Sequence, residues 1–194
     1  LNVSEFVALS ISNAMLFERA EKLSITDGLT GLDNHQQMQT VLKNEVIRCK
    51  RYNSTLAVII MDIDHFKQVN DTYGHQKGDE ILLEFSTIMK KFCRSNDLAA
   101  RYGGEEFFLV LPETPIGGAL HIAERIREEM ASQKFQSKGK DFHVTVSCGI
   151  AEFDTARMQS AADLIKVSDL ALYKAKNEGR NRTIQGNADD LIDA

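Results

Sequence analysis

The sequence contains few of the residues that mark specialised classes of protein. Cysteine occurs only three times in 194 residues, and Cys49, Cys93 and Cys148 lie far apart without a C-x-x-C pair. We therefore expect three reduced thiols rather than a disulfide framework or a zinc site. Only two prolines interrupt the chain, which also has no internal repeat and no low-complexity tract. These absences favour an ordinary globular domain.

The chain also lacks a long hydrophobic run and an excess of basic residues. No apolar stretch reaches the roughly 18 residues of a membrane span, and no signal peptide opens the sequence. Lysine and arginine total 23 against 28 aspartates and glutamates, so the formal net charge is −5. This charge argues against a protein that coats nucleic acid. We therefore expect no membrane span in this segment, no nucleic-acid partner and a cytoplasmic location, although a longer parent protein could be tethered to a membrane.

Residues 1–25 differ from the rest of the chain. Apolar side chains recur at helical spacing from Val3 to Phe17 and predict a helix with a broad apolar face. Such a helix needs a partner, so we expect a coiled coil with a second copy, with packing on its own domain as the alternative. The chain begins at Leu1 rather than methionine, so we expect a signalling helix cut from an upstream sensory domain. Asn13-Ala14 and Phe17-Glu18 loosely resemble the exit helix of a GAF-type domain.

Helix and strand patterns alternate over residues 26–184. Helical periodicity occurs at residues 34–51, 81–92, 116–132 and 161–179, and strand patterns occur at residues 55–61, 98–102, 107–111 and 143–150. The second and third of these strands flank Gly103-Gly104-Glu105-Glu106, which predicts a β-hairpin. The interleaving predicts an α/β (α+β) domain with a central mixed, largely antiparallel sheet flanked by helices. The polar tail, residues 185–194, is expected to be frayed.

Two acidic clusters stand at predicted strand ends. Asp62-Ile63-Asp64 ends the buried strand, and Glu105-Glu106 lies at the tip of the hairpin. Because side chains alternate along a strand, Asp62 and Asp64 share a face, whereas Glu105 and Glu106 point opposite ways. One carboxylate from each cluster can meet across adjacent strands, where a proton or a cation would relieve their repulsion. Such oxygen ligands suit Mg²⁺ held partly by substrate phosphates, and solvated loop ends are the alternative.

The stretch after the first cluster offers groups for a phosphate and for a base. Backbone amides at a turn into a helix near Phe66, with Lys67 beside them, form a natural phosphate site. Asn70 offers a donor and an acceptor and Asp79 only acceptors, which together match the edge of guanine. Adenine lacks the paired donors, so an aspartate here disfavours it. The basic run around Lys176 lies at the C-terminal end of the last helix, where complementing the helix dipole is the alternative role.

Five motifs in this order and spacing resemble the GGDEF family of diguanylate cyclases. Gly103-Gly104-Glu105-Glu106-Phe107 is similar to the family signature in its GGEEF form. The other four are Asp27 to Leu32 (DGLTGL), Asp62 to Lys67 (DIDHFK), Asn70-Asp71 through Gly78-Asp79, and Ala175-Lys176 with Gly179-Arg180-Asn181. Together they cover about residues 26–184. The chain departs from the family at Asp33-Asn34-His35, where Pro-Asn-Arg is common.

The resemblance implies a nucleotidyl-cyclase or palm-like fold and an enzyme that joins two GTP molecules into cyclic di-GMP plus two pyrophosphates. It implies that Asp62, Glu105 and the backbone carbonyl of Ile63 bind catalytic Mg²⁺ or Mn²⁺. Glu106 would lie beside the reacting 3′-hydroxyl. The implied substrate contacts are Gly103 and Gly104 for close approach of the nucleotide, the backbone amides of Phe66 for phosphate, Lys67, Lys176 and Arg180 for the phosphate tail, and Asn70 and Asp79 for guanine.

The resemblance also implies a homodimer and a product-inhibition site. One domain holds one GTP, so two domains must face each other for the reaction. Arg94-Ser95-Asn96-Asp97 matches the R-x-x-D inhibitory site in its register against the hairpin, and Arg125 could add a contact from a helix of the same or a neighbouring domain. Two alternatives stay open. A cyclase making hybrid cyclic GMP-AMP is disfavoured by Asp79, and a catalytically silent cyclic di-GMP receptor is disfavoured by the two hairpin glutamates.

Overall fold

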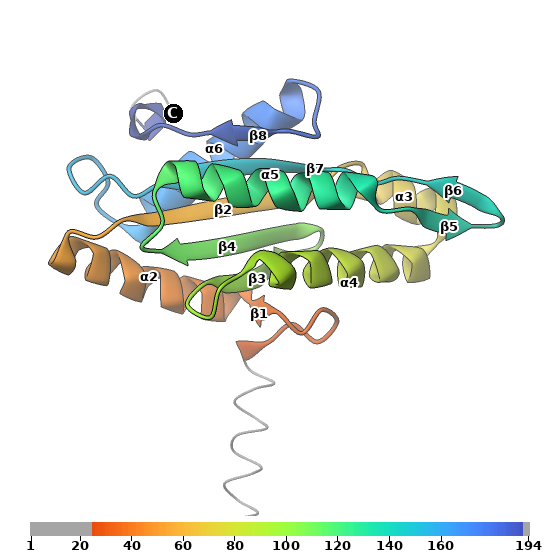
Figure 1. The fold of residues 1–194 in the computed structure, drawn as a ribbon, viewed down its shortest axis with the longest axis horizontal. Helices are drawn as coiled ribbons and strands as arrows, with labels where there is room; N and C mark the ends of the chain where they lie inside the picture. Colours follow the sequence, from red (N-terminus) through yellow and green to blue (C-terminus); the bar gives the residue numbers. More distant parts are fainter. Residues whose placement is uncertain (1–24, 192–194) are drawn as a thin grey trace, which may run out of the picture.

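The computed structural model describes residues 25–191, which form a six-stranded sheet with helices on both faces (Figure 1). The strand order is β1-β3-β4-β2-β7-β8. The three central pairings are antiparallel, whereas β1 and β8 pair in parallel with their neighbours. The strands are β1 (Asp33–Asn34), β2 (Leu56–Ile63), β3 (Leu98–Gly103), β4 (Glu106–Pro112), β7 (Val146–Glu152) and β8 (Thr183–Gln185). The predicted mixed, largely antiparallel sheet is confirmed.

Two layers of helices bury the sheet. The helices are α2 (His35–Tyr52), α3 (Phe66–Tyr73), α4 (His75–Phe92), α5 (Ile116–Ser132) and α6 (Ala161–Asn177). Apolar side chains of α2 and α6 form one hydrophobic cluster with Val58 and Ile60 of β2. Those of α3, α4 and α5 form a second cluster with Ile59 and Met61, which point the other way. Burial on both faces explains why β2 is a continuous apolar run rather than an alternating one.

Local signals set where several helices begin. The Asn34 side chain accepts a hydrogen bond from the Gln37 amide and caps α2. Ser160 and Asp163 form a capping box at the start of α6. Gly74 separates α3 from α4 with a φ of 89°, a conformation that glycine adopts without steric cost. The stretch that carries the predicted phosphate and guanine residues is therefore two helices with a sharp turn between them.

The tail forms regular structure as far as Leu191, so the expectation that residues 185–194 are frayed was wrong for residues 185–191. β8 lies beside β7, and the Gly186 amide donates to the carbonyl of Ile150 (2.8 Å). A 3₁₀ helix, η1 (Ala188–Leu191), follows and buries Ala188. The edge of β7 carries backbone groups that need partners, and β8 supplies them with three residues, too few to show a strand pattern in the sequence.

Other features of the fold also escaped the sequence patterns. The strand expected from residue 143 begins at Val146. A small two-stranded hairpin, β5 (Phe135–Ser137) and β6 (Lys140–Phe142), follows α5 and was not predicted. It packs through Phe142, whose ring stacks on Tyr73 of α3 with 4.1 Å between centroids.

The helix expected in residues 1–25 lies outside the described part of the chain, apart from residue 25 itself. All three cysteines belong to the described part and are free thiols. Burial raises the pKa of Cys93 and Cys148 to about 12, so neither is a reactive thiolate at neutral pH. Among residues 25–191, no helix has the length and apolarity that crossing a membrane requires.

Gly149 lies where α6 comes closest to the sheet. A Cβ at this position would sit 2.1 Å from the Ser168 carbonyl oxygen and 2.4 Å from the Leu172 amide nitrogen. Helix backbone cannot rotate away, so the added methyl must push α6 off β7. We expect Gly149→Ala to lower the free energy of unfolding by about 3 kcal/mol in urea denaturation. Gly117→Ala is the control, because its Cβ would meet nothing within 4 Å. Equal stability of the two variants would contradict this contact.

Candidate active site

The end of β2 and the tip of the β3–β4 hairpin bring the two acidic clusters together. Asp62 lies directly opposite Glu106 in the β2–β4 register, and the Ile63 amide donates to the Glu105 carbonyl (3.3 Å). Asp62 is only 8% exposed, and the Nζ of Lys176 lies 2.8 Å from its Oδ2. The arrangement agrees with the meeting of carboxylates expected from strand alternation.

Burial dominates the electrostatics of this cluster. It raises the pKa of Asp62 to about 6, opposed by Lys176 and reinforced by Glu105 and Glu106. Burial also raises the pKa of Glu106; Lys176 opposes this rise, and Asp169 and Glu105 add to it. The ion pair with Lys176 does not offset the desolvation of Asp62. The cluster therefore favours a further cation.

The oxygen atoms at this point fit a hard divalent cation. The available donors are the carboxylates of Asp62 and Glu105 and the backbone carbonyl of Ile63. Between residues 25 and 191, no group of three or more metal-ligating side chains is already assembled. Mg²⁺ is typically bound through one or two carboxylates plus substrate phosphates rather than by a complete protein cage. The donor set therefore suits a metal that arrives together with a phosphate ligand.

A hollow of about 520 Å³ opens beside the acids, between α3, α4 and the hairpin. Six of the predicted site residues line it: Phe66, Lys67, Asn70, Asp79, Gly104 and Glu105. The hollow is also lined by four residues without a predicted role, namely Asp71, His75, Leu82 and Arg101. Gly103 lies in the adjoining hairpin, whereas Lys176 and Arg180 do not line the hollow. Most of the predicted substrate residues thus share one concave surface.

Arg101 holds the tip of the hairpin in place. Its Nη2 and Nε donate to the carbonyl of Gly104 (2.7 and 2.9 Å), and Gly104 has a φ of 56°. Its Nη1 lies 3.2 Å from Oδ1 of Asp27, which also accepts from the amide and hydroxyl of Thr30. One guanidinium therefore ties the DGLTGL turn to the glycines of the hairpin. No role was predicted for Arg101, although it lies only two positions before the signature.

Asp64 anchors the loop that carries Arg180. Its carboxylate is 4% exposed and accepts from the hydroxyls of Thr145 (2.6 Å) and Ser147 (2.7 Å) and from the Asn181 amide (3.1 Å). Asn181 directly follows Arg180, so Asp64 fixes this loop beside the end of β2. No role could be predicted for Asp64 from a local motif, because its partners are 81 to 117 positions away in the chain.

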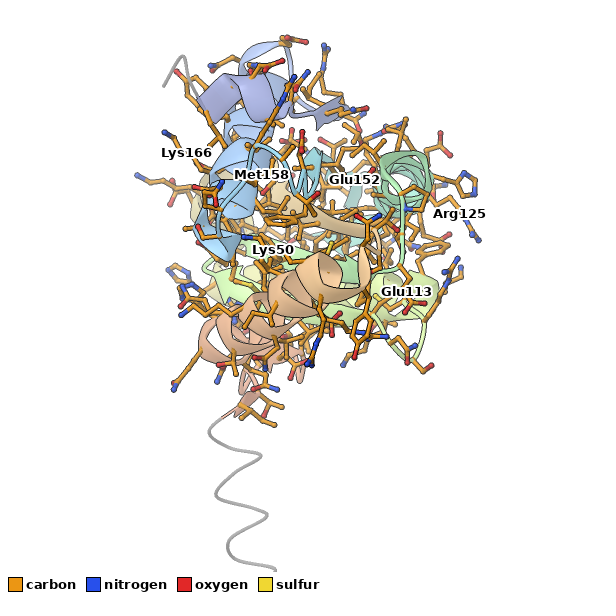
Figure 2. The ribbon with its side chains drawn as sticks, turned by 90° about the vertical axis from the view of Figure 1, so that its left-hand side faces the viewer. Lys50, Glu113, Arg125, Glu152, Met158 and Lys166 are labelled. Carbon is orange, nitrogen blue, oxygen red and sulfur yellow. The ribbon has the colours of Figure 1, made fainter. Side chains whose placement is uncertain are left out.

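The residues of the expected inhibitory site divide between two places. The amide of Arg94 donates to Oδ2 of Asp97 (2.7 Å), and both residues line a hollow of about 350 Å³ together with Lys90. Arg125 lies on the outside of α5, over the ring of Phe92 at 4.5 Å from its centroid, in a separate hollow (Figure 2). Arg125 does not line the hollow of Arg94 and Asp97, so a contact from it within the same chain stays a prediction. A contact from a neighbouring copy stays a prediction.

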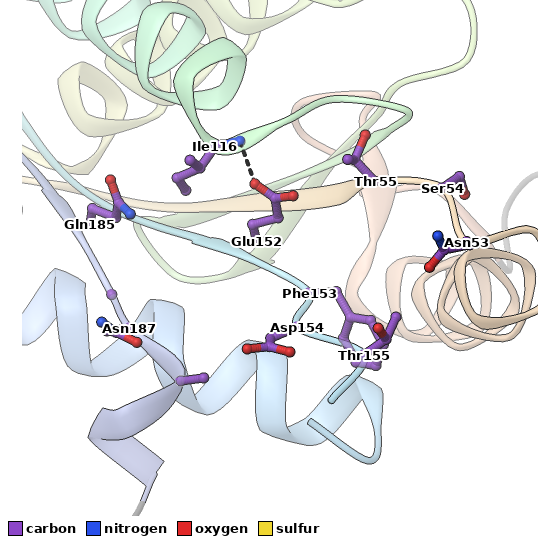
Figure 3. Close-up of a pocket in the computed structure, with 12 residues that line it drawn as sticks. Asn53, Ser54, Thr55, Ile116, Glu152, Phe153, Asp154, Thr155, Gln185 and Asn187 are labelled. Atoms are coloured by element: carbon purple, nitrogen blue, oxygen red, sulfur yellow. Dashed lines mark hydrogen bonds between the residues drawn. The ribbon is translucent and has the colours of Figure 1, made fainter. Parts of the chain in front are cut away.

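A further hollow of about 530 Å³ lies at the opposite end of β2 (Figure 3). Glu152 projects into it, and its Oε2 accepts from the Ile116 amide (2.7 Å) at the start of α5. This contact satisfies a backbone donor that the helix itself leaves unpaired. None of the predicted site residues lines this hollow, so it is not part of the candidate active site.

Comparison with known proteins identifies the family. The family model for "Diguanylate cyclase, GGDEF domain" matches residues 24–182. Diguanylate cyclase A of Treponema denticola is 36% identical over 184 residues, which are 93% of this chain and 48% of that protein. The response regulator PleD of Caulobacter vibrioides is 39% identical over 169 residues, 84% of this chain and 36% of that protein. The chain thus spans about half or less of the length of these relatives.

Solved structures agree with this match. The coiled coil and GGDEF domain of DgcB from Caulobacter crescentus, in complex with c-di-GMP, has a TM-score of 0.90 at 29% identity and covers 95% of this chain and 97% of that one. The active GGEEF domain of a diguanylate cyclase from Vibrio cholerae has a TM-score of 0.75 at 34% identity, covering 79% and 97%. With the signature at the hairpin and the acids beside it, the chain belongs to the GGDEF family of diguanylate cyclase domains.

Proposed function

We propose that this chain is a catalytic domain that joins two GTP molecules into cyclic di-GMP and releases two pyrophosphates. The observation that carries the proposal is the position of Asp62 opposite Glu106, beside a hollow lined by Asn70 and Asp79. The acids suit a metal-bound triphosphate, and the hollow suits a guanine base. The two lie on adjoining elements, as one bound nucleotide requires.

Each group in the site has a part in binding the substrate. Asn70 and Asp79 pair with the guanine edge, since their donors and acceptors complement it. Lys67, Lys176 and Arg180 bind the phosphate tail, and the first amides of α3 at Phe66 add to that site. The ammonium group of Lys176 pairs with the carboxylate of Asp62, so it lies within reach of a phosphate group that a metal ion would hold beside Asp62.

Asp62, Glu105 and the Ile63 carbonyl would hold Mg²⁺ or Mn²⁺, which lowers the pKa of a hydroxyl and neutralises charge on a leaving phosphate. Glu106 accepts the proton of the 3′-hydroxyl, and its raised pKa suits it to that exchange. The 3′-oxygen then bonds to the α-phosphorus of the second GTP, and the bond from that phosphorus to the pyrophosphate group breaks. A second, symmetric step closes the ring.

The reaction needs two domains face to face, and we propose that residues 1–25 bring two copies together. An upstream sensory domain, of GAF type or another, would control that approach. A cytoplasmic location belongs to the same proposal, because GTP is the substrate. Cross-linking of the purified chain, with and without residues 1–25, tests the dimer directly.

The activity itself is tested by incubating the purified chain with GTP and Mg²⁺ and quantifying products by chromatography. We expect two pyrophosphates for each cyclic di-GMP. A parallel incubation with equal GTP and ATP separates the alternatives, since substantial cyclic GMP-AMP would overturn the assignment of Asp79. Binding of cyclic di-GMP without any turnover of GTP would instead support the silent receptor.

Product feedback gives a further prediction at Arg94. We propose that Arg94 and Asp97 bind cyclic di-GMP, since a guanidinium can hold a phosphate or stack on a base. Arg94→Ala is expected to raise the product concentration for half-inhibition about tenfold or more, because a charge-assisted contact is lost. The initial rate without product should stay near that of the parent chain. Equal inhibition of Arg94→Ala and an Arg51→Ala control would remove this assignment.

A further inference from the structure

The side chain of Asn70 lies against the backbone of α4 at Gly78. A Cβ built on Gly78 would sit 2.0 Å from Oδ1 of Asn70 and 3.1 Å from its Cγ. It would also sit 3.1 Å from the Cζ of Phe66. The amide of Asn70 therefore occupies the volume that any side chain at position 78 would need.

The oxygen in that contact has no hydrogen-bond partner. Oδ1 of Asn70 is buried, and no donor among the described residues reaches it. An unpaired buried oxygen is costly, so stability alone does not explain this conformation of Asn70. Asn70 as a whole is only half-buried, and it lines the 520 Å³ hollow beside Asp79. Asn70 thus combines a buried oxygen without a partner with a place in the wall of this hollow.

We propose that Gly78 is a specificity-determining positioning residue, whose missing side chain lets Asn70 lie where it contacts the guanine base. This inference rests on the proposed function and extends it from Asn70 and Asp79 to the helix that supports them. Gly78 itself does not line the hollow. It acts by leaving room for the Asn70 amide, and the preceding helix, α3, supplies the amide itself.

The geometry separates this role from a structural one. The atom that an alanine at 78 would meet most closely is the end of a side chain, which can rotate away at little cost. Alanine also favours a helix interior over glycine. Gly78→Ala should therefore fold as well as the parent chain while Asn70 is turned away from the base.

The experiment measures binding of an α,β-methylene analogue of GTP, which cannot release pyrophosphate, with Mg²⁺ by titration calorimetry. We expect Gly78→Ala to bind at least tenfold more weakly, with an undiminished thermal midpoint. Binding of the matching ATP analogue should change little, so the preference for guanine shrinks. Gly117→Ala, the same substitution in a helix with open space around it, should bind as the parent chain does.

Asn70→Ala and the double variant Asn70→Ala/Gly78→Ala complete a cycle. If Gly78 acts through Asn70, the double variant binds the GTP analogue as weakly as Asn70→Ala alone. A further tenfold loss in the double variant, or unchanged binding by Gly78→Ala, would overturn the inference while leaving the proposed function intact. A parent chain that binds both analogues equally would refute the proposed guanine site, and this inference with it.

Discussion

Glu105→Gln is expected to lower cyclic di-GMP synthesis about 10³-fold or more at saturating GTP and Mg²⁺. The glutamine keeps the size of the side chain and removes the negative charge that would hold the metal beside Asp62. Losing several kcal/mol of transition-state stabilisation corresponds to a factor of this size. The position lies in the hairpin and lines the hollow, so no hydrophobic contact of the core is disturbed. Initial rates of pyrophosphate release measure the effect.

The matched control for this variant is Glu113→Gln. Glu113 follows β4, and its exposed carboxylate pairs with Arg48, away from the hairpin tip. This control should retain the rate of the parent chain. Activity within tenfold of the parent in Glu105→Gln would mean that Glu105 does not carry the metal, and the mechanism proposed above would then fail.

Asp62→Asn is expected to abolish synthesis as well, yet to make the metal-free protein more stable at pH 8. Burial, together with Glu105 and Glu106, holds the pKa of Asp62 at about 6 against an ordinary value of 3.8. The fold therefore disfavours the charged form, even with Lys176 beside it. An asparagine of the same shape carries no such penalty, and the gain is at most about 3 kcal/mol. Urea denaturation in EDTA measures it.

The pH dependence of this stability has a definite sign. The pKa of Asp62 is higher in the folded state than in the unfolded state, so the folded protein binds more protons between about pH 4 and pH 6. Relative to Asp62→Asn, the parent chain should therefore lose stability as the pH rises through that window and stay level above it. Below pH 4 the two should agree. A less stable Asp62→Asn at pH 8 would show that the ion pair with Lys176 outweighs burial.

Strong periodicity and strand alternation made the central features predictable from the sequence. Helix α5 has the bounds that its apolar spacing indicated, because one face packs on the sheet over its whole length. That one carboxylate from each acidic cluster can meet across adjacent strands was expected from strand alternation, and the register of β2 and β4 places Asp62 opposite Glu106. Such features repeat along a continuous segment, so the segment alone carries the information.

Features that depend on distant contacts escaped prediction. Asp64 accepts hydrogen bonds from residues at the start of β7 and from the loop after α6, and no local sequence pattern predicts those partners. In the sequence, Gly78 is only one of several glycines in the motifs. The structure shows that the side chain of Asn70 occupies the space that a Cβ at position 78 would need. Arg125 is an exposed helix position whose direction is set by Phe92. In each case the tertiary packing, rather than the local sequence, decides what the residue does.

The short strand β8 covers the outer edge of β7. Without it, the seven-residue strand β7 would be the edge of the sheet, and the carbonyl of Ile150 would lose its partner at Gly186. An apolar edge strand with free backbone groups is a template on which another chain can add and aggregate. A recombinant domain that ends at residue 182, where the match to the family model stops, would expose that template. One that runs through Gly186 keeps the edge of β7 covered.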